Sequence, residues 1–373
     1  MRPVAFLLGN LTDGGSETKV VRMANRMVRV GLPVHLIYLG APHTLRDAID
    51  DDVPVEFLDR GGKFSFRALK RLRKYVSSEA IGTVFCVNHY PLVYGWPVFR
   101  AGTGRRCFGA INTYEIPALR DRLFMLLYAF ILRRCDRVIF GSRAQQQLWV
   151  EKYRLQKDRT TVIYNGVDAD HFRGPDDPDM DLRASLDIDE DAIVIGCVAH
   201  LRPEKSHQDL LAAMASPGMR SNAVLLLIGD GPEEPALRQY VELHDLSAAI
   251  RFVGRVDDVR PYLSLMDIFV LPSSSEVFSN AILEAMAARI PVVCTAVGGS
   301  IEMVESGETG FLYPRHDVDE LVKALETLIA DSACRERFGA NAAARVREMF
   351  SIERMDEQYV DLMSWSSSER DRD

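Results

Sequence analysis

The sequence predicts an α/β protein with two Rossmann-like domains, each built on a doubly wound parallel sheet. The chain has 373 residues, which is more than one ordinary hydrophobic core accommodates. Short apolar runs alternate with amphipathic stretches along nearly its whole length, as in parallel strands joined by helices. Residues 173–181, RGPDDPDMD, interrupt this alternation with Pro, Gly and Asp, which indicates a linker between two domains.

The apolar runs that read as strands form two groups, one on each side of the linker. The first group is PVAFLLG (3–9), VHLIYL (34–39), GTVFCV (82–87), CFGAI (107–111), RVIFG (137–141) and TVIYNG (161–166). The second group is AIVIGCVA (192–199), AVLLLIG (223–229), IRFVG (250–254), IFVLP (268–272), PVVCT (291–295) and GFLY (310–313). Ligands of doubly wound sheets bind outside the carboxyl ends of the strands, so the candidate residues are those that follow these runs.

These patterns divide the chain into five expected parts. An N-terminal domain covers residues 1–172, the linker covers 173–181, and a C-terminal domain covers 182–350. An amphipathic helix over 351–366 is expected to pack back toward the first domain. The charged residues 367–373 are expected to form a disordered tail.

Composition argues against several classes of protein. No run of about 18 apolar residues occurs, so no membrane-spanning helix is expected. The first residues, MRPVAFLLGN, predict a buried strand rather than a signal peptide. The six cysteines are scattered without a C-x-x-C pair, which predicts free thiols in a reducing cytoplasm and no structural zinc.

The net charge of −8 hides an asymmetry between the two halves. Residues 1–173 carry 27 Lys and Arg against 16 Asp and Glu, a net charge of +11. Residues 174–373 carry 18 against 37, a net charge of −19. We expect the basic half to face something anionic. Nucleic acid is not expected, because no helix-turn-helix pattern or interleaving of basic and aromatic residues occurs.

Two basic residues follow the first strand of the second half. Arg202 and Lys205 lie in VAHLRPEKSHQDLL, three positions apart, just after the strand that ends at Ala199. A guanidinium and an ammonium group at this place suit a diphosphate. The alternative is a pair of ordinary surface residues in a loop.

Two glycines lie at the end of the next predicted strand. Gly229 and Gly231 form a tight strand-to-helix turn in LLLIGDGPEEP, where glycine also permits close approach of a ligand to the backbone. Arg255 and Val256 follow the strand at 250–254 and are further candidates for binding the same ligand.

Two glutamates eight positions apart occur in SSSEVFSNAILEAM. Glu276 lies in a loop of small residues, whereas Glu284 lies among the apolar positions of a predicted helix and needs a hydrogen-bond partner there. A ribose diol is a suitable partner. If the helix begins at Ser279 or Asn280, the free N–H groups from Phe278 onward can bind hydroxyl or phosphate oxygens. The alternative is that Glu284 caps a neighbouring loop and Glu276 is exposed.

The first half has a glycine turn of its own. Gly14 and Gly15 follow the first strand and precede an amphipathic helix, but the G-x-G-x-x-G spacing of a dinucleotide site is missing. NAD is therefore not expected.

In this order, the motifs resemble the nucleotide-sugar glycosyltransferases of family 4, and the resemblance covers nearly the whole chain. The matching segments are Gly14–Glu17 (G-G-x-E), Asn165–Asp168 (N-G-V-D), Arg202 with Lys205, Gly229–Glu233, and Glu276 with Glu284 (Glu-x7-Glu). The resemblance implies the GT-B fold, with two Rossmann-like domains facing across a cleft. It also implies a retaining transfer of a hexose or N-acetylhexosamine, without a metal or other cofactor.

The resemblance also implies roles. Arg202 and Lys205 would neutralise the departing diphosphate, and Glu276 would hold the hydroxyls of the sugar; these three are the expected catalytic residues. Glu284 would accept hydrogen bonds from the ribose. Gly14 and Gly15 would let the first domain close over the diphosphate, and a phosphate oxygen would take the proton of the acceptor. A UDP-sugar is the expected donor, with a GDP-sugar as the alternative.

Three departures from the family pattern stand out. Val277 replaces the glycine of the common E-G-F-G motif, and Arg289 stands where a glycine is usual. The family histidine that follows a strand of the first domain corresponds by strand order to Asn112. We therefore take His89, Asn112 and Glu115 as candidates for the acceptor side.

The acceptor is expected to be a saccharide, either lipid-linked or soluble. Residues 61–79 form a basic amphipathic pattern that suits an anionic membrane surface, although a helix that simply covers its sheet is the alternative. The apolar stretch within 120–138 is too short to span a membrane. Together they predict a cytoplasmic protein at the membrane periphery that acts on cell-envelope glycan precursors.

Other functions remain open at this point. Two carboxylates also occur in glycosidases, but the adjacent basic pair argues against that class. A soluble natural-product glycosyltransferase, a nucleotide-sugar epimerase and an inactive nucleotide-sugar-binding partner are the alternatives.

Overall fold

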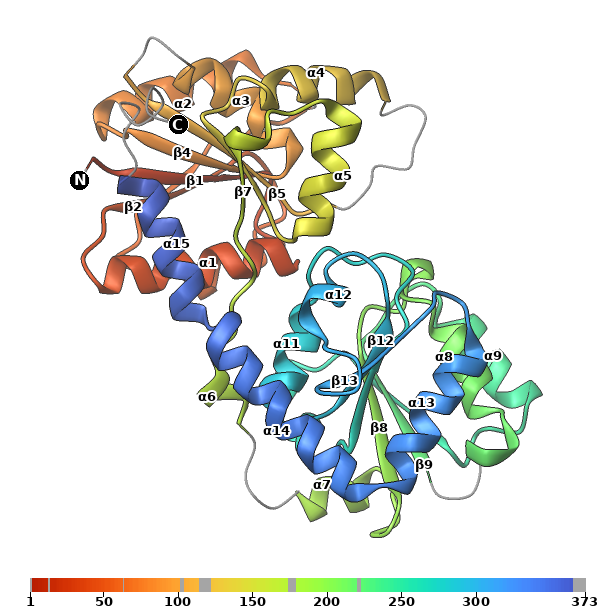
Figure 1. Cartoon of the computed structure of the whole chain (residues 1–373). Helices are drawn as coiled ribbons and strands as arrows, with labels where there is room; N and C mark the ends of the chain where they lie inside the picture. Colours follow the sequence, from red (N-terminus) through yellow and green to blue (C-terminus); the bar gives the residue numbers. More distant parts are fainter. Residues whose placement is uncertain are drawn as a thin grey trace. The chain divides into compact units, whose positions relative to one another are not determined.

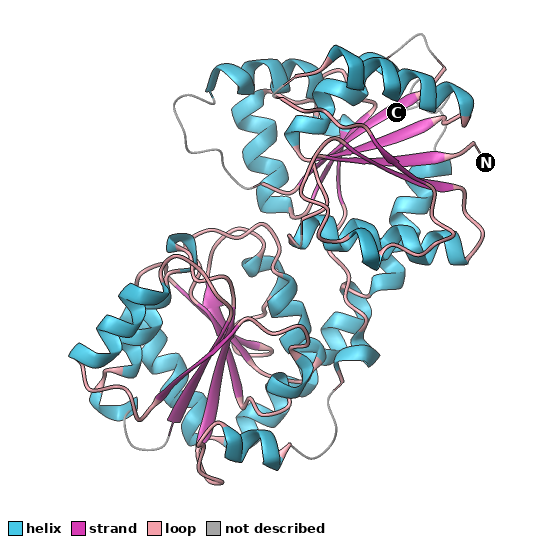
Figure 2. Ribbon diagram, turned by 180° about the vertical axis from the view of Figure 1, so that it is seen from behind, coloured by secondary structure: helices cyan, strands magenta, loops and turns pink. Residues whose placement is uncertain are grey.

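A computed structural model describes residues 2–12, 14–62, 64–100, 104–113, 122–173, 179–219 and 223–364. It confirms the predicted fold class. The chain forms two compact units, each with a parallel sheet between layers of helices (Figures 1 and 2). The first unit is Met1–Tyr164 together with Met355–Asp373, and the second is Asn165–Arg354.

The first unit has a seven-stranded parallel sheet in the order β3-β2-β1-β4-β5-β6-β7. Its strands are β1 (Val4–Leu8), β2 (Val34–Tyr38), β3 (Val55–Phe57), β4 (Thr83–Val87), β5 (Arg106–Ile111), β6 (Arg137–Phe140) and β7 (Thr160–Val162). The central strands are apolar at nearly every position because helices cover both faces of the sheet. The edge strand β3 has only three residues and was not predicted from the sequence.

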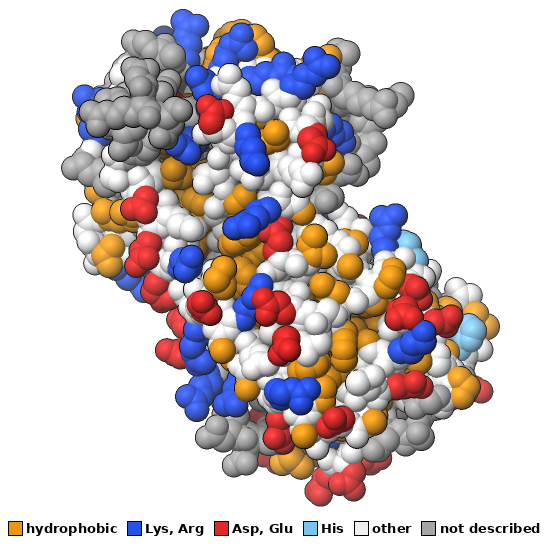
Figure 3. Space-filling view, in the orientation of Figure 1, with side chains coloured by type: hydrophobic (Ala, Val, Ile, Leu, Met, Phe, Trp, Pro, Cys, Tyr) orange, Lys and Arg blue, Asp and Glu red, His pale blue; other side chains and the backbone are white. Residues whose placement is uncertain are grey.

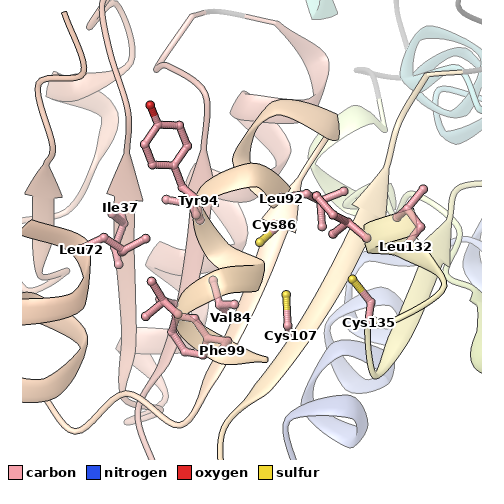
Figure 4. Close-up of a cluster of buried hydrophobic side chains, with 14 of the residues drawn as sticks. Ile37, Leu72, Val84, Cys86, Leu92, Tyr94, Phe99, Cys107, Leu132 and Cys135 are labelled. Carbon is pink, nitrogen blue, oxygen red and sulfur yellow. The ribbon is translucent and has the colours of Figure 1, made fainter. Parts of the chain in front are cut away.

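Side chains that alternate along the strands pack against two different helix layers. The helices that join the strands are α1 (Gly15–Arg29), α2 (Phe66–Ser78), α3 (His89–Phe99), α4 (Arg122–Leu132) and α5 (Arg143–Tyr153). Leu7 and Cys86 belong to a core formed with α2, α3, α4 and α5 (Figure 4). Phe6 and Phe85 point the other way and contact Tyr359 of the C-terminal helix, with ring centroids 6.2 and 5.6 Å away.

The C-terminal helix α15 (Ile352–Ser364) belongs to the first unit from Met355 onward. Tyr359 is buried, and Arg26 of α1 makes a bidentate pair with Asp356 at 2.7 and 2.9 Å. Arg106 donates to the carbonyl of Met363 at 2.6 Å. Burial of the Tyr359 ring contributes about 2 kcal/mol, which exceeds the about 1 kcal/mol of a partly exposed ion pair, so apolar packing dominates this attachment.

The second unit has a six-stranded parallel sheet in the order β10-β9-β8-β11-β12-β13. Its strands are β8 (Ile193–Val198), β9 (Ala223–Ile228), β10 (Ile250–Gly254), β11 (Ile268–Leu271), β12 (Val292–Thr295) and β13 (Gly310–Tyr313). Each of them coincides with an apolar run that the sequence analysis took as a strand.

Helices cover both faces of the second sheet as well (Figure 2). One layer contains α8 (His207–Met214), α9 (Glu234–Leu243) and α13 (Val318–Ala330). The other contains α6 (Ala169–Phe172), α11 (Asn280–Ala287) and α14 (Ser332–Met349). The short helices α7 (Met180–Ser185), α10 (Arg260–Leu263) and α12 (Ser300–Met303) complete the unit.

The boundary between the units lies at Tyr164 rather than at residue 172. Asn165 belongs to the second unit because its side-chain amide donates to the carbonyl of Phe278 at 3.1 Å and to Asn280 Oδ1 at 3.0 Å. Val167 forms a β-bridge with Ser351. The expected linker is also shorter than predicted, because α7 begins at Met180. The expected tail 367–373 lies outside the described residues.

The order of the strands reverses at one place in each sheet. In the first unit the reversal lies between β1 and β4, and in the second between β8 and β11. Connections on the two sides of such a point lead away from each other and leave a crevice at the carboxyl ends of the strands. The loops after these four strands are therefore the places to look for ligand-binding residues.

The basic helix at 61–79 is α2, and most of its apolar side chains face the sheet. Leu69, Leu72 and Val76 are buried in the core, and Ser65 caps the helix by accepting from the amide of Ala68 at 3.2 Å. Most of the apolar face expected to contact lipid is therefore buried within the protein, and Phe64 and Phe66 remain exposed at its start. Among the described residues, no helix combines the length and the apolar character needed to cross a bilayer.

Arg289, which replaces a glycine of the family pattern, has a left-handed backbone with φ +65°. It ends α11 in a Schellman motif, in which the amide of Arg289 bonds to Met286 and that of Ile290 to Ala285. A side chain costs about 1 kcal/mol in this conformation, which glycine adopts freely.

We therefore predict that Arg289→Gly raises the free energy of unfolding by about 0.5–1 kcal/mol, as measured by urea denaturation. Arg289→Ala is the matched control, because it removes the charge and keeps the Cβ atom. Equal stabilisation by both variants would contradict backbone strain as the cause.

Candidate active site

The crevice of the second unit brings together the two loops that carry the predicted basic and acidic residues. Lys205 lies in the loop after β8, and Glu276 lies in the loop after β11. These two strands are neighbours at the point of reversal. The chain thus places both residues where a doubly wound fold binds its ligand.

Lys205 Nζ donates a hydrogen bond directly to Glu276 Oε1. The two side chains are 22% and 10% exposed, so this ion pair is largely removed from water. Ser273 Oγ donates to the same carboxylate oxygen at 2.8 Å. A buried ion pair held in this way leaves neither charge without a partner, and breaking it costs several times more than breaking a surface pair.

The backbone also joins the two loops. The amide of Ser274 donates to the carbonyl of Glu204 at 2.8 Å, and its hydroxyl donates to the same carbonyl at 3.1 Å. Arg202 precedes the 3₁₀ turn Pro203–Lys205 and is exposed, and Ser206 ends that turn with φ +50°. The turn therefore presents an exposed guanidinium beside a half-buried ammonium group.

Gly229 and Gly231 are needed because the chain packs against itself. A Cβ atom at Gly229 would lie 2.1 Å from the carbonyl oxygen of Ala199, and one at Gly231 would lie 2.4 Å from that of Leu201. The backbone amide of Leu201 donates to the backbone carbonyl of Asp230 at 2.8 Å, between these two glycines. These glycines position the loop of Arg202 and Lys205, a role that the sequence analysis did not assign to them.

The start of α11 uses its side chains to hold the protein together. Ser279 is the N-cap and accepts from the amide of Ile282 at 3.4 Å. Phe278 is buried against Phe350, and Asn280 accepts from Asn165. The backbone N–H groups at the start of this helix remain candidates for ligand binding.

Glu284 lies one turn along α11 and is half-buried, so it is more exposed than the sequence suggested. Its apolar neighbours Ile282, Leu283 and Ala285 are fully buried. The carboxylate therefore lies at the margin of the apolar face and does not need to be neutralised by a ligand in order to be tolerated.

Val277 occupies its position without backbone strain, because its φ is not positive. A Cβ atom at Gly299 would lie 2.1 Å from the carbonyl oxygen of Val277. The close packing at this turn thus requires glycine at residue 299, on the facing loop.

Arg255 and Val256 follow β10, at the edge of the sheet and two strands away from β8. Arg255 is exposed and Val256 is half-buried. The structure therefore places Arg255 and Val256 two strands away from the strand that leads to Lys205.

The crevice of the first unit contains a lysine that the sequence analysis missed. Lys19 Nζ donates to Asn112 Oδ1 at 3.3 Å, and the amide of Asn112 donates to Asn88 Oδ1 at 3.1 Å. Gly14 is the N-cap of α1 and Gly15 is its first residue. Desolvation lowers the pKa of the half-buried Lys19 to about 8. The sequence signal that could have identified Lys19 is its position one turn into a helix that follows a glycine turn.

His89 and Glu115, the other two acceptor-side candidates, have different outcomes. His89 is buried and stacks on Trp149 at 5.1 Å, and burial lowers its pKa to about 4. Its ring is part of the core, which argues against the role given to it from the sequence. Glu115 lies outside the described residues.

His207 is buried close to the ion pair. It is 3% exposed and neither ring nitrogen has a hydrogen-bond partner among the described residues. Desolvation, aided by the Lys205 charge, lowers its pKa to about 4. The imidazole is therefore neutral at physiological pH and adds no positive charge beside that of Lys205.

Two family models match this chain. "Glycosyltransferase Family 4" matches residues 13–171, and "Glycosyl transferases group 1" matches residues 179–345. Between them they cover most of both units.

The chain is similar to curated proteins at about one third identity. It is 33% identical over 183 residues to the lipopolysaccharide core biosynthesis glycosyltransferase LpsE of Rhizobium meliloti, covering 49% of this chain and 53% of the relative. It is 31% identical over 233 residues to the N-acetyl-alpha-D-glucosaminyl L-malate synthase of Bacillus anthracis, covering 62% and 60%. The matches thus span little more than half the length of these relatives.

A solved structure shares the fold over the whole chain. Anabaena Alr3699/HepE in complex with UDP superimposes with a TM-score of 0.85 and 22% identity, covering 97% of this chain and 99% of that one. At this identity the likeness shows the fold alone, which is GT-B.

The buried His207 predicts a loss of stability in acid. A histidine whose pKa falls from 6.5 to about 4 on folding binds a proton more readily in the unfolded state, so stability falls as the pH drops from 6.5 toward 4. We expect this effect to reach about 2–3 kcal/mol near pH 4 in urea denaturation, and to be absent in His207→Leu. At pH 8 the histidine is neutral in the folded and the unfolded state, so the difference in free energy of unfolding between the wild type and His207→Leu measures packing alone. An unchanged difference between pH 8 and pH 4.5 would contradict the prediction.

Proposed function

The chain belongs to the GT-B glycosyltransferases of family 4, and on that premise we propose that it is a retaining, metal-independent hexosyltransferase. It would move a hexose or N-acetylhexosamine from a nucleoside-diphosphate sugar to a hydroxyl group. The observation that carries this proposal is the ion pair of Lys205 and Glu276 at the carboxyl ends of β8 and β11.

The ion pair suits a donor with an anionic and a neutral part. The diphosphate would take Lys205 from Glu276, with the exposed Arg202 on its outer side. The carboxylate released in this way would accept hydrogen bonds from hydroxyl groups of the sugar. Donor binding would then give Lys205 a new anionic partner and leave the Glu276 carboxylate hydrogen-bonded to Ser273 and to neutral hydroxyl groups of the sugar.

The same groups would favour the chemical step. Negative charge builds up on the diphosphate as its bond to the anomeric carbon breaks, and two fixed cations stabilise that charge. The acceptor oxygen would form its bond on the face that the diphosphate leaves, which retains the configuration. A phosphate oxygen would take the proton of the acceptor hydroxyl, so no protein base is required.

We propose UDP as the first nucleotide to test, because HepE, whose fold this chain shares, has been solved with UDP and with UDP-glucose. A GDP-sugar is the alternative. Glu284, together with the backbone N–H groups at the start of α11, would bind the ribose and the sugar.

The acceptor would be a saccharide bound by the first unit, where Lys19 and Asn112 are the candidate contacts. The name of LpsE suggests a lipid-linked or other cell-envelope glycan precursor. The protein would then act in the cytoplasm at the periphery of the membrane, with the basic residues of 61–79 near an anionic surface.

The test is a donor screen in which UDP-, GDP- and ADP-sugars are each incubated with the protein, with and without lipid extract, and released nucleotide is measured. We expect one donor to be consumed. Lys205→Met should lower its turnover about 100-fold or more, because one of the two cations at the leaving group is lost. Lys323→Met is the matched control, since Lys323 also pairs with a glutamate, Glu320, but on the exposed face of α13.

Two outcomes would contradict the proposal. Binding of a nucleotide sugar without consumption of any donor would indicate an inactive binding protein. Full turnover in Lys205→Met would show that this ammonium group does not act on the diphosphate.

A further inference from the structure

Three neighbouring helices of the first unit contain no acidic residue. α2 contacts α3, and α3 contacts α4, so the three form one layer on the same face of the sheet. Their sequences, FRALKRLRKYVSS, HYPLVYGWPVF and RLFMLLYAFIL, have no Asp or Glu. In a chain with 53 acidic residues and a net charge of −8, such a layer is a marked local departure.

The exposed hydrophobic side chains are concentrated on the same layer. Among the described residues, ten large hydrophobic side chains are exposed, and six of them lie on or just before these helices: Phe64, Phe66, Phe124, Leu126, Leu127 and Phe130. Phe66 is 79% exposed and Leu126 is 70% exposed. Single exposed hydrophobic residues are ordinary on a protein surface, but a cluster of this size marks a binding surface.

Helix α4 is apolar on both of its faces. Met125, Ala129 and Leu132 point into the core of the first unit. Phe124, Leu127 and Phe130, at helical spacing on the opposite side, are 54%, 45% and 42% exposed. A helix that is apolar all round is normally buried on all sides, so its outer face is suited to an apolar environment.

Aromatic contacts link the hydrophobic residues of the layer to α3. Trp96 of α3 packs edge-on against Phe130 at 5.9 Å. Phe64 stacks on Tyr94 of α3 at 5.3 Å and contacts Phe66 at 5.0 Å. The residues before α2 and those on α4 are therefore attached to the same central helix.

Basic side chains border these hydrophobic residues. The outer face of α2 carries five exposed basic residues, Arg67, Lys70, Arg71, Arg73 and Lys74. Arg71 is paired with Glu56 of β3 at 2.5 Å, so among the described residues the other four carry the uncompensated charge of this helix. Arg134, just after α4, lies over the ring of Phe130 at 3.6 Å. Figure 3 shows Lys and Arg side chains next to hydrophobic ones along the part of the surface where α2 to α4 lie in Figure 1.

We propose that the outer face of α2, α3 and α4 is a docking surface for an anionic lipid bilayer. The exposed side chains of α4, with Phe64 and Phe66, would enter the boundary between headgroups and acyl chains. The basic residues of α2 would lie against the anionic headgroups, each strengthening binding about fivefold.

This surface differs from the one expected from the sequence, since Leu69, Leu72 and Val76 of α2 are buried and α4 supplies most of the exposed hydrophobic side chains. It deepens the proposed function, which places the acceptor at a membrane, but lipid binding can be measured without any sugar donor.

The charge distribution favours lipid over other occupants. A second copy docked face to face would bring two layers together whose helices carry basic and no acidic residues, and like charges oppose such an interface. Nucleic acid would satisfy the basic residues but would leave Phe124, Leu126 and Leu127 without apolar partners. An anionic bilayer satisfies both.

The experiment is sedimentation of the full chain with vesicles of phosphatidylcholine alone or mixed with phosphatidylglycerol, without nucleotide sugar. We expect binding to the mixed vesicles that weakens as salt is raised. Phe124→Ser/Leu127→Ser should weaken it by about tenfold or more, because two apolar groups no longer enter the bilayer. Lys70→Gln/Arg73→Gln/Lys74→Gln should weaken it by about a hundredfold.

The matched control is Arg22→Gln on α1 combined with Val30→Ser just after it, because α1 lies on the other face of the sheet (Figure 1). Val30 is 75% exposed and Arg22 is exposed, so this variant removes the same kinds of group and should bind like the wild type. Far-UV circular dichroism melts check that each variant is folded.

Three results would overturn the proposal. The first is failure of the folded wild type to bind mixed vesicles. The second is undiminished binding by both the α4 and the α2 variants. The third is a concentration-dependent dimer, without vesicle binding, that Phe124→Ser/Leu127→Ser dissociates. Donor consumption measured in parallel is independent of all three, so failure of lipid docking can be told apart from failure of the proposed activity.

Discussion

The candidate active site of the second unit depends on the ion pair of Lys205 and Glu276. It joins the loops after β8 and β11 at the point where the strand order reverses, and both side chains are largely removed from water. A buried pair of this kind contributes little net stability, because desolvation offsets most of the attraction. Its value is that it holds two charges in place until a ligand with matching groups replaces one partner. The proposed donor, an anionic diphosphate joined to a neutral sugar, has such groups.

Much of the surrounding structure holds this pair in position. The glycines at 229 and 231 allow the next loop to pack against Ala199 and Leu201, which lead directly into Arg202. His207, neutral because it is buried, places no second cation beside Lys205. Gly299 allows its loop to pack against the carbonyl of Val277 beside Glu276. These residues do not need to touch a ligand to matter, because each fixes the backbone from which a binding side chain extends.

The sequence was sufficient to predict every strand except β3, and to predict which loops of the second unit carry Lys205 and Glu276, but not the distances between side chains. Strands such as β8 and β11 are nearly continuous apolar runs, and the residues after them could be predicted to meet at one edge. That Lys205 would bond Glu276 itself depends on side-chain positions across 71 residues of chain, which no local pattern encodes. The same limit explains why His89 was taken for an acceptor-side residue, since its stacking on Trp149 is a tertiary contact. It also explains why the domain boundary was predicted too late in the chain, since the hydrogen bonds of Asn165 to Phe278 and Asn280 are tertiary contacts as well. Lys19 was overlooked because only the fold brings it to Asn112.

Calorimetric titration of UDP and GDP into the wild type and Glu276→Gln measures whether a diphosphate displaces Glu276 from Lys205. If the diphosphate takes Lys205 from Glu276, the variant lacks both the competing carboxylate and its repulsion of the ligand. The nucleotide that the wild type binds should then bind the variant about five- to tenfold more tightly. Equal or weaker binding by a folded Glu276→Gln protein would contradict the exchange of partners at this site.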